Sequence, residues 1–369
     1  MNINKSNTLL NINLTIISLV IFFYVLYIGS SFIIPFVIAL FLAFSIISTY
    51  SFFKKHIKNS FVSFIITALI YGFIFWIVAN IINKNIEDIL LKSSFYQDQL
   101  RFLIDKNVLR FGLEEGEFYQ KLWNYIDLQR VFNSMATLIT NMFSYIWIIL
   151  FYLIFILLEY KFFSKKLDLI ISDKDKRKKV FDIIHEIRQD VKSYFLIKTF
   201  VSLLTWLFSY MVMKSVWLDF AMFWAFLIFI LNFIPNIWSV IAVIFPAVLS
   251  LIQFDGHVNF FIVLSWLILI QMIVWNIIDP KLTWNKLNLS PLVILLALVF
   301  WWLIWGFVGA ILSVPIMVII SIIFSKFEET KPLAILLSEK WVLKSNLDIE
   351  LTKAEIKTLQ KVKNFFVNK

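Results

Sequence analysis

Three aspartates are the residues of this sequence with the clearest potential for chemistry. Asp219, Asp255 and Asp279 each lie at or near the end of a long apolar run, and Asp279 is followed directly by Pro280. A charged side chain inside a bilayer is costly and marks an ion or proton pathway by default, whereas one at a helix end is usually hydrated. Asp279 is therefore a candidate for binding a cation or a proton, with a plain helix terminus as the alternative.

Two apolar segments are interrupted by proline and glycine. Phe220 to Leu251 and Ser290 to Ser325 are each longer than the roughly 20 residues that a helix needs to span a bilayer. The candidate pathway residues at and around these interruptions are Asn232, Pro235, Asn236, Asp279, Pro280, Pro291, Gly306, Gly309 and Pro315. A break at membrane depth frees backbone groups that lipid cannot satisfy, so a pair of such segments points to a substrate site. The alternative is two kinked spans, because proline and glycine are common in transmembrane helices.

The composition places these segments in an all-α, polytopic membrane protein. Of the 369 residues, 61% are hydrophobic and 16% are charged, which leaves too few charges for the surface of a soluble protein. We expect about six to eight transmembrane helices. The chain has no cysteine and three scattered histidines, so we expect no metal site and no cofactor. The net charge of +10 is explained by lysine and arginine in cytoplasmic loops and not by nucleic-acid binding.

The distribution of charge predicts four regions and their sides of the membrane. Residues 1–82 form three transmembrane helices, and residues 83–136 form a small helical extracytoplasmic domain with nearly balanced charge. Residues 137–325 form a transmembrane core with a basic cytoplasmic loop at 159–192, and residues 326–369 form a cytoplasmic tail. Because basic loops stay in the cytoplasm, both termini are expected there.

The loop from Pro280 to Ser290 decides how the two interrupted segments cross the membrane. It carries Lys281 and Lys286 and no acidic residue. If each segment spanned once, this loop would lie outside, against the usual distribution of positive charge. If each were a re-entrant hairpin, the loop would be cytoplasmic and the hairpins would enter from opposite faces. We therefore favour hairpins over kinked spans.

Several motifs in this order resemble one family. Their residues are Pro35, Asn232-Phe233-Ile234-Pro235, Asp279-Pro280-Lys281, Leu289-Ser290-Pro291, and Gly306 to Pro315 in the pattern Gly-x-x-Gly-x-x-x-x-x-Pro. Together they resemble the autoinducer-2 exporter family of PerM-type permeases. The resemblance implies a bacterial inner-membrane transporter that assembles as a homo-oligomer and exports the signalling molecule or exchanges cations and protons. Trp238 stands near the position where such proteins usually have a glycine, which makes the first break bulkier.

The residues bear on three classes of function. A secondary transporter of a small polar solute, with a possible coupling cation or proton, is favoured, because the Gly-x-x-x-x-Gly-Lys motif of ATP-driven proteins is absent from the sequence. The sequence shows no clustered acid–base or nucleophile–base residues, so we expect no enzyme. A membrane scaffold with a basic tail is the third possibility. We also expect Gly306 and Gly309 to allow a close approach of the backbone to another helix or to the solute.

Overall fold

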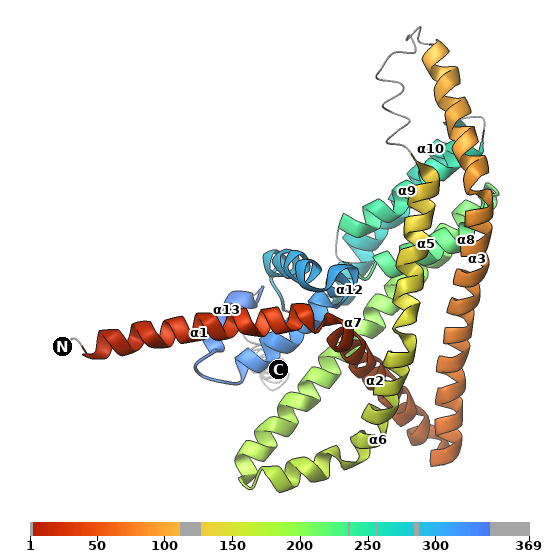
Figure 1. The fold of residues 1–369 in the computed structure, drawn as a ribbon. Helices are drawn as coiled ribbons and strands as arrows, with labels where there is room; N and C mark the ends of the chain where they lie inside the picture. Colours follow the sequence, from red (N-terminus) through yellow and green to blue (C-terminus); the bar gives the residue numbers. More distant parts are fainter. Residues whose placement is uncertain (1–2, 111–126, 235–236, 255–256, 284–287, 340–369) are drawn as a thin grey trace, which may run out of the picture. The chain divides into compact units, whose positions relative to one another are not determined.

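The computed structural model describes residues 3–110, 127–234, 237–254, 257–283 and 288–339 (Figure 1). Every regular element in these ranges is a helix, which confirms the all-α prediction. The chain divides into two compact units. The first unit comprises Met1–Lys166 and Leu196–Pro280, and the second comprises Leu167–Phe195 and Lys281–Lys369.

The first unit begins with three consecutive helices, α1 (Ile3–Ile28), α2 (Ser30–Ile57) and α3 (Ser60–Arg110). Helix α2 packs against both α1 and α3. The Ser45 hydroxyl lies 2.6 Å from the Tyr71 hydroxyl, a hydrogen bond between α2 and α3. Helices α2 and α3 are each long and apolar enough to cross a membrane, and α1 contains the shorter apolar stretch Asn13–Ile28.

Helix α3 is much longer than a bilayer is thick. Its 51 residues extend for about 76 Å, against a hydrocarbon core of about 30 Å. Residues 83–110, the first part of the predicted extracytoplasmic domain, continue the helix that begins at Ser60. Between Gly72 and Gly112 the sequence has no glycine or proline to end the helix. Gly112 and Gly116, later in the same predicted domain, lie outside the described residues.

The middle of the chain forms α5 (Leu128–Ser144), α6 (Ile146–Ile170) and α7 (Lys174–Ser215). Helix α5 packs along α3. Residues 137–158, where the predicted transmembrane core begins, are divided between α5 and α6, and most of the predicted basic loop at 159–192 is helical. Helix α7 runs unbroken from its basic beginning into an apolar half, because no glycine or proline interrupts it.

The first interrupted segment folds as a helical hairpin. Helix α8 (Ala221–Leu231) and helix α9 (Ile237–Gln253) pack against each other. Each helix is shorter than a full span. Helix α9 also packs on α10 (His257–Ile273), which continues as a π-helix, η1 (Val274–Ile278), and then α11 (Asp279–Thr283). Pro235 and Asn236, at the predicted break, lie outside the described residues.

The second interrupted segment turns back at glycine within α12 (Pro291–Ser325). Gly306 has φ 60° and ψ −141°, a conformation that only glycine adopts easily. Trp301 and Gly309 would lie about 12 Å apart in a continuous helix. Instead, a β-carbon at Gly309 would lie 2.0 Å from the backbone oxygen of Trp301. The two halves of α12 therefore form a sharp bend, and Gly309 permits their close approach.

A small apolar core holds the second unit together. Helix α13 (Lys331–Leu337) packs on α12, and the Ser290 backbone N–H donates to the Leu337 backbone oxygen at 2.9 Å. The buried core residues are Tyr194, Leu289, Val314, Val318 and Ile322. An ion pair of 2.5 Å between Lys326 and Glu186 links the end of α12 to the first half of α7.

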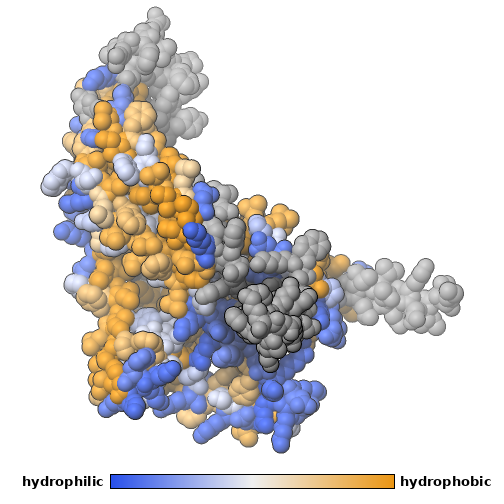
Figure 2. Space-filling view, turned by 180° about the vertical axis from the view of Figure 1, so that it is seen from behind, coloured by the Kyte–Doolittle hydropathy of each residue, from blue (hydrophilic) through white to orange (hydrophobic). Residues whose placement is uncertain are grey.

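Six helices in the described ranges are long and apolar enough to cross a membrane, and α8 is among the shorter apolar ones. Many of their large hydrophobic side chains are exposed, such as Leu69 and Trp76 on α3 and Phe155 on α6. Figure 2 shows such side chains covering broad areas of the molecular surface. Because water would disfavour such a surface, this arrangement agrees with a polytopic membrane protein.

Candidate solute pathway

A buried ion pair joins α7 to the start of α11 within the first unit. The Lys198 ammonium donates to the Asp279 carboxylate at 2.7 Å. The Lys198 side chain is 9% exposed and that of Asp279 is 22% exposed. Asp279 was predicted to be a candidate, whereas its partner Lys198 was not. Paired charges of this kind within membrane helices usually mark an ion or solute pathway.

The π-helix η1 places Asp279. The Asp279 backbone N–H donates to the backbone oxygen of Val274, five residues earlier, in place of the usual four. A single wide turn inserts one extra residue and rotates everything that follows, and such turns are frequent at functional sites. The helix that carries Gln271 and Asp279 therefore brings these two residues to nearly the same face, two turns apart.

A second polar contact lies at the end of α8. The Asn232 side-chain nitrogen donates to the Ser202 hydroxyl at 3.2 Å and lies 3.5 Å from the Thr205 hydroxyl oxygen. All three residues are almost fully buried. Asn232 was predicted from the sequence, and the structure places it against α7, which the sequence had not indicated.

Four buried polar residues in the apolar half of α7 form one stripe. Lys198, Ser202, Thr205 and Ser209 are each at most 7% exposed and are spaced by four, three and four residues. This spacing puts them on one helix face. Their spacing within a predicted span is the signal from which the sequence could have revealed them. The stripe connects the ion pair with the Asn232 contact.

The remaining predicted residues divide between the two units. Pro280 lies in α11 next to Asp279, and in the second unit Pro291 occupies the first turn of α12. Pro315 is buried inside α12, beyond the bend that Gly306 and Gly309 form. Thus the structure brings Asn232 and Asp279 to one stripe of α7, and it gathers the two glycines at a separate bend.

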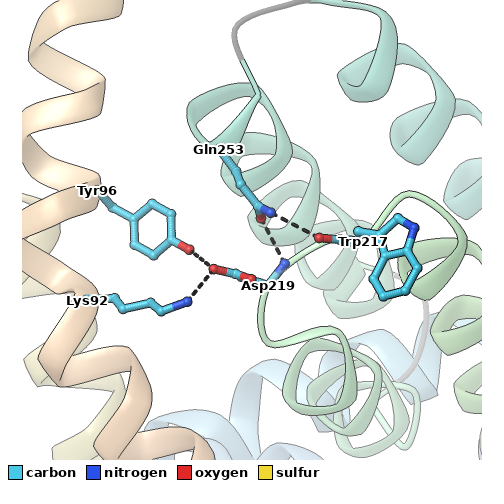
Figure 3. Close-up of polar contacts among 5 residues, drawn as sticks. All are labelled: Lys92, Tyr96, Trp217, Asp219 and Gln253. Carbon is cyan, nitrogen blue, oxygen red and sulfur yellow. Dashed lines mark hydrogen bonds and ion pairs between the residues drawn. The ribbon is translucent and has the colours of Figure 1, made fainter.

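A second carboxylate cluster surrounds Asp219, between α7 and α8 (Figure 3). Lys92 and Tyr96, one turn apart on α3, donate to the Asp219 carboxylate at 2.7 and 2.6 Å. The Asp219 backbone N–H donates to the Gln253 side-chain oxygen at 2.8 Å, and the Gln253 nitrogen donates to the Trp217 backbone oxygen at 3.0 Å. The cluster thus ties α3, the α7–α8 turn and the end of α9 together.

The local conformation and charge of this cluster are unusual. Trp217 and Phe220, on either side of Asp219, have φ values of 58° and 55°, which are strained for bulky residues. Burial raises the pKa of Asp219, but hydrogen bonds from Lys92 and Tyr96 and the charge of Lys92 outweigh it. The pKa of Asp219 therefore lies below its ordinary value, and the carboxylate stays ionised near neutral pH.

Comparison with known proteins assigns the chain to a family. The model of the AI-2E family transporters matches residues 16–329. A transport protein of Borreliella burgdorferi, described as putative, is 30% identical over 274 residues, which cover 73% of this chain and 74% of that protein. The AI-2 transport protein TqsA of Escherichia coli is 32% identical over 222 residues, which cover 59% of this chain and 63% of TqsA. The match spans both units and both bends, so the chain belongs to the AI-2E family of membrane transporters.

Proposed function

We propose that this chain is a secondary transporter that exports a small polar solute across the bacterial cytoplasmic membrane. The observation that carries the proposal is the buried polar stripe of α7 with its contact to Asn232. Ser202 and Thr205 lie near the middle of the apolar second half of α7, a helix long and apolar enough to cross a membrane. Secondary transporters bind their substrates near the bilayer midplane, beside interrupted helices. Because TqsA is described as an AI-2 transport protein, AI-2 is the first solute to test.

The Lys198–Asp279 pair is the proposed site of ion coupling. In a medium of low dielectric, a charge that loses its partner is strongly destabilised. When a proton or cation reaches Asp279, Lys198 loses its counter-charge, and the link between α7 and the start of α11 weakens. Such a two-state contact can couple ion movement to solute release.

The bend at Gly306 and Gly309, with Pro291 and Pro315, is proposed to form the second hairpin of the pathway. The Gly309→Ala variant places a β-carbon against the Trp301 backbone and should reduce AI-2 transport. Gly72→Ala is the matched control, because no atom lies within 4 Å of a β-carbon there. Equal, wild-type transport by both inserted variants would exclude this role for the bend.

The proposed topology has cytoplasmic termini, an extracytoplasmic region at residues 83–136, and a cytoplasmic basic segment at 159–192 with the tail from residue 326. We also propose that the chain assembles as a homo-oligomer. Helix α6 supports an interaction with further protein or lipid, because most of its large apolar side chains, such as Phe151, Phe155 and Leu158, are exposed. Native mass spectrometry in detergent measures the number of subunits, and a purely monomeric spectrum would contradict assembly.

Transport by the purified protein tests the function. Proteoliposomes are loaded with AI-2, and its release is measured with and without an imposed proton or sodium gradient. We expect release above that of protein-free liposomes, and a dependence on one of the two gradients. Release equal to the protein-free control would contradict AI-2 as the solute. A proton or sodium flux without any solute would favour an antiporter instead.

A further inference from the structure

Gln271 of α10 is a buried polar residue without a hydrogen-bond partner in the described part of the chain. It is 4% exposed, and both its side-chain oxygen and nitrogen lack a partner. Trp224 Nε1 is also unpaired, but it can only donate. Leaving a buried carboxamide unsatisfied costs free energy, so such a group in a native fold calls for an explanation.

The position of Gln271 relates it to the polar stripe of α7. From the Lys198–Asp279 contact, two helical turns along α7 lead to Thr205, and two turns back along η1 and α10 lead to Gln271. Gln271 also lies in the second half of the candidate membrane span His257–Ile278. Thr205 and Gln271 therefore lie at about the same distance from the ion pair, measured along the axis of the helix that carries each of them.

The hairpin formed by α9 and α10 gives a second, independent indication of how far along the helices Gln271 lies. Three residues separate the end of α9 at Gln253 from the start of α10 at His257, and the two helices pack together. In an antiparallel pair, Gln271 then lies level with the first turn of α9. That turn follows the break after Asn232, which contacts Ser202 and Thr205.

We propose that Gln271 binds the transported solute directly, by offering its carboxamide oxygen and nitrogen to a small molecule that carries both hydroxyl donors and acceptors. The inference rests on the proposed transport function and adds a residue that determines specificity. A carboxamide can pair with a hydroxyl in both directions. Because the described residues offer no partner to these buried groups, a polar molecule is favoured there over an apolar one of the same size.

The first experiment separates solute binding from a role in packing. Gln271→Leu keeps the bulk of the side chain and removes both polar groups. If Gln271 binds solute, the melting temperature stays unchanged or rises, and the KM for AI-2 in proteoliposomes rises about tenfold, the effect of one lost hydrogen bond. Ser265→Leu is the control, because Ser265 is a polar residue that is exposed on α10 itself. A lower melting temperature with an unchanged KM would overturn the proposal.

The second experiment does not depend on the identity of the solute. The chain has no cysteine, so Gln271→Cys introduces a single thiol. We expect the small polar reagent 2-aminoethyl methanethiosulfonate to modify it, as measured by intact-protein mass. Val263→Cys, at an equally buried position two turns earlier, should stay unmodified. An unreactive Gln271→Cys variant would overturn the proposal. Absence of AI-2 transport by the wild type would contradict AI-2 as the solute, and the thiol measurement would still be valid.

Discussion

The two aspartate clusters of the first unit have the same ion-pair distance and different surroundings. The Lys198–Asp279 and Lys92–Asp219 pairs both measure 2.7 Å. The Lys198 side chain is 9% exposed, whereas that of Lys92 is 50% exposed. Asp219 has a second donor in Tyr96, so it keeps a partner if its lysine is lost.

This difference in burial gives the two ion pairs different roles. Breaking the Lys198–Asp279 pair would change the stability of the helix arrangement, whereas the Lys92–Asp219 pair holds helices together in a fixed arrangement. Removing one partner of a buried pair leaves an uncompensated charge, which costs much more than the pair itself contributes. The charges of an exposed pair are hydrated whether or not the pair is formed, so its loss changes the free energy of unfolding little. Burial, and not the distance between the atoms, therefore identifies Asp279 as the coupling candidate and Asp219 as a structural junction.

In the proposed topology, the Lys92–Asp219 and Lys198–Asp279 clusters lie on opposite sides of the membrane. Ser94→Cys lies two residues after Lys92 and is exposed, and Asn285→Cys lies six residues after Asp279, in the part of the sequence that the structure does not describe. With a membrane-impermeant thiol reagent on intact cells, we expect labelling at position 94 and protection at position 285 until the membrane is opened. Labelling of both from outside would favour eight plain spans and contradict the hairpins.

The next largest effect is expected for Asp279→Asn. The change leaves Lys198 without its counter-charge at nearly constant shape, which should destabilise the protein by about 3 kcal/mol. Transport should lose its dependence on pH or sodium. Asp279→Glu retains the charge and serves as the matched control. If the Asn variant keeps the wild-type melting temperature and gradient dependence, Asp279 is only a helix terminus.

A smaller and pH-dependent effect is expected for Asp219→Asn. The pKa of Asp219 is lower in the folded protein than its ordinary value of 3.8. Its charge therefore contributes stability that is fully present above that ordinary value and is lost as the pH falls through the lowered, folded value. The Asn variant should melt below the wild type at pH 7, and the difference should shrink only below about pH 4. A difference that is constant down to pH 3 would show that the charge plays no part.

Much of this architecture could be predicted from the pattern of apolar and helix-breaking residues. The two interrupted segments were recognisable because Pro235, Gly306 and Gly309 stand in runs too long for one span. The bend at Gly306 follows from its positive φ. By contrast, the continuation of α3 to Arg110 was missed, because its second half changes from apolar to amphipathic without any change in backbone conformation.

The partners in the site could not be predicted in the same way. Asp279 was a candidate because it is a charge beside an apolar run, but pairing with Lys198 depends on how residues 81 positions apart are packed. Ser202 and Thr205 are small hydroxyl residues that are tolerated anywhere in a transmembrane helix, since they can bond to their own backbone. Thr205 does so, with the Val201 oxygen. Only the tertiary contact with Asn232 distinguishes them.

The smallest effect is expected for Lys92→Met, and it tests the exposed side of the comparison most directly. Methionine keeps the unbranched side chain and removes the charge, while Tyr96 still donates to Asp219. Because Lys92 is half exposed, the loss should stay below about 1 kcal/mol and should decrease further at high salt, where exposed charges are screened. Thermal melting at low and high ionic strength measures both.

Tyr96→Phe should destabilise the protein more than Lys92→Met. The Tyr96 side chain is fully buried against Phe132 and Phe220, so this variant removes the hydrogen-bond donor of Asp219 that is shielded from water. The reverse order would mean that the charge of Lys92 dominates, and that the two clusters differ less than their burial indicates.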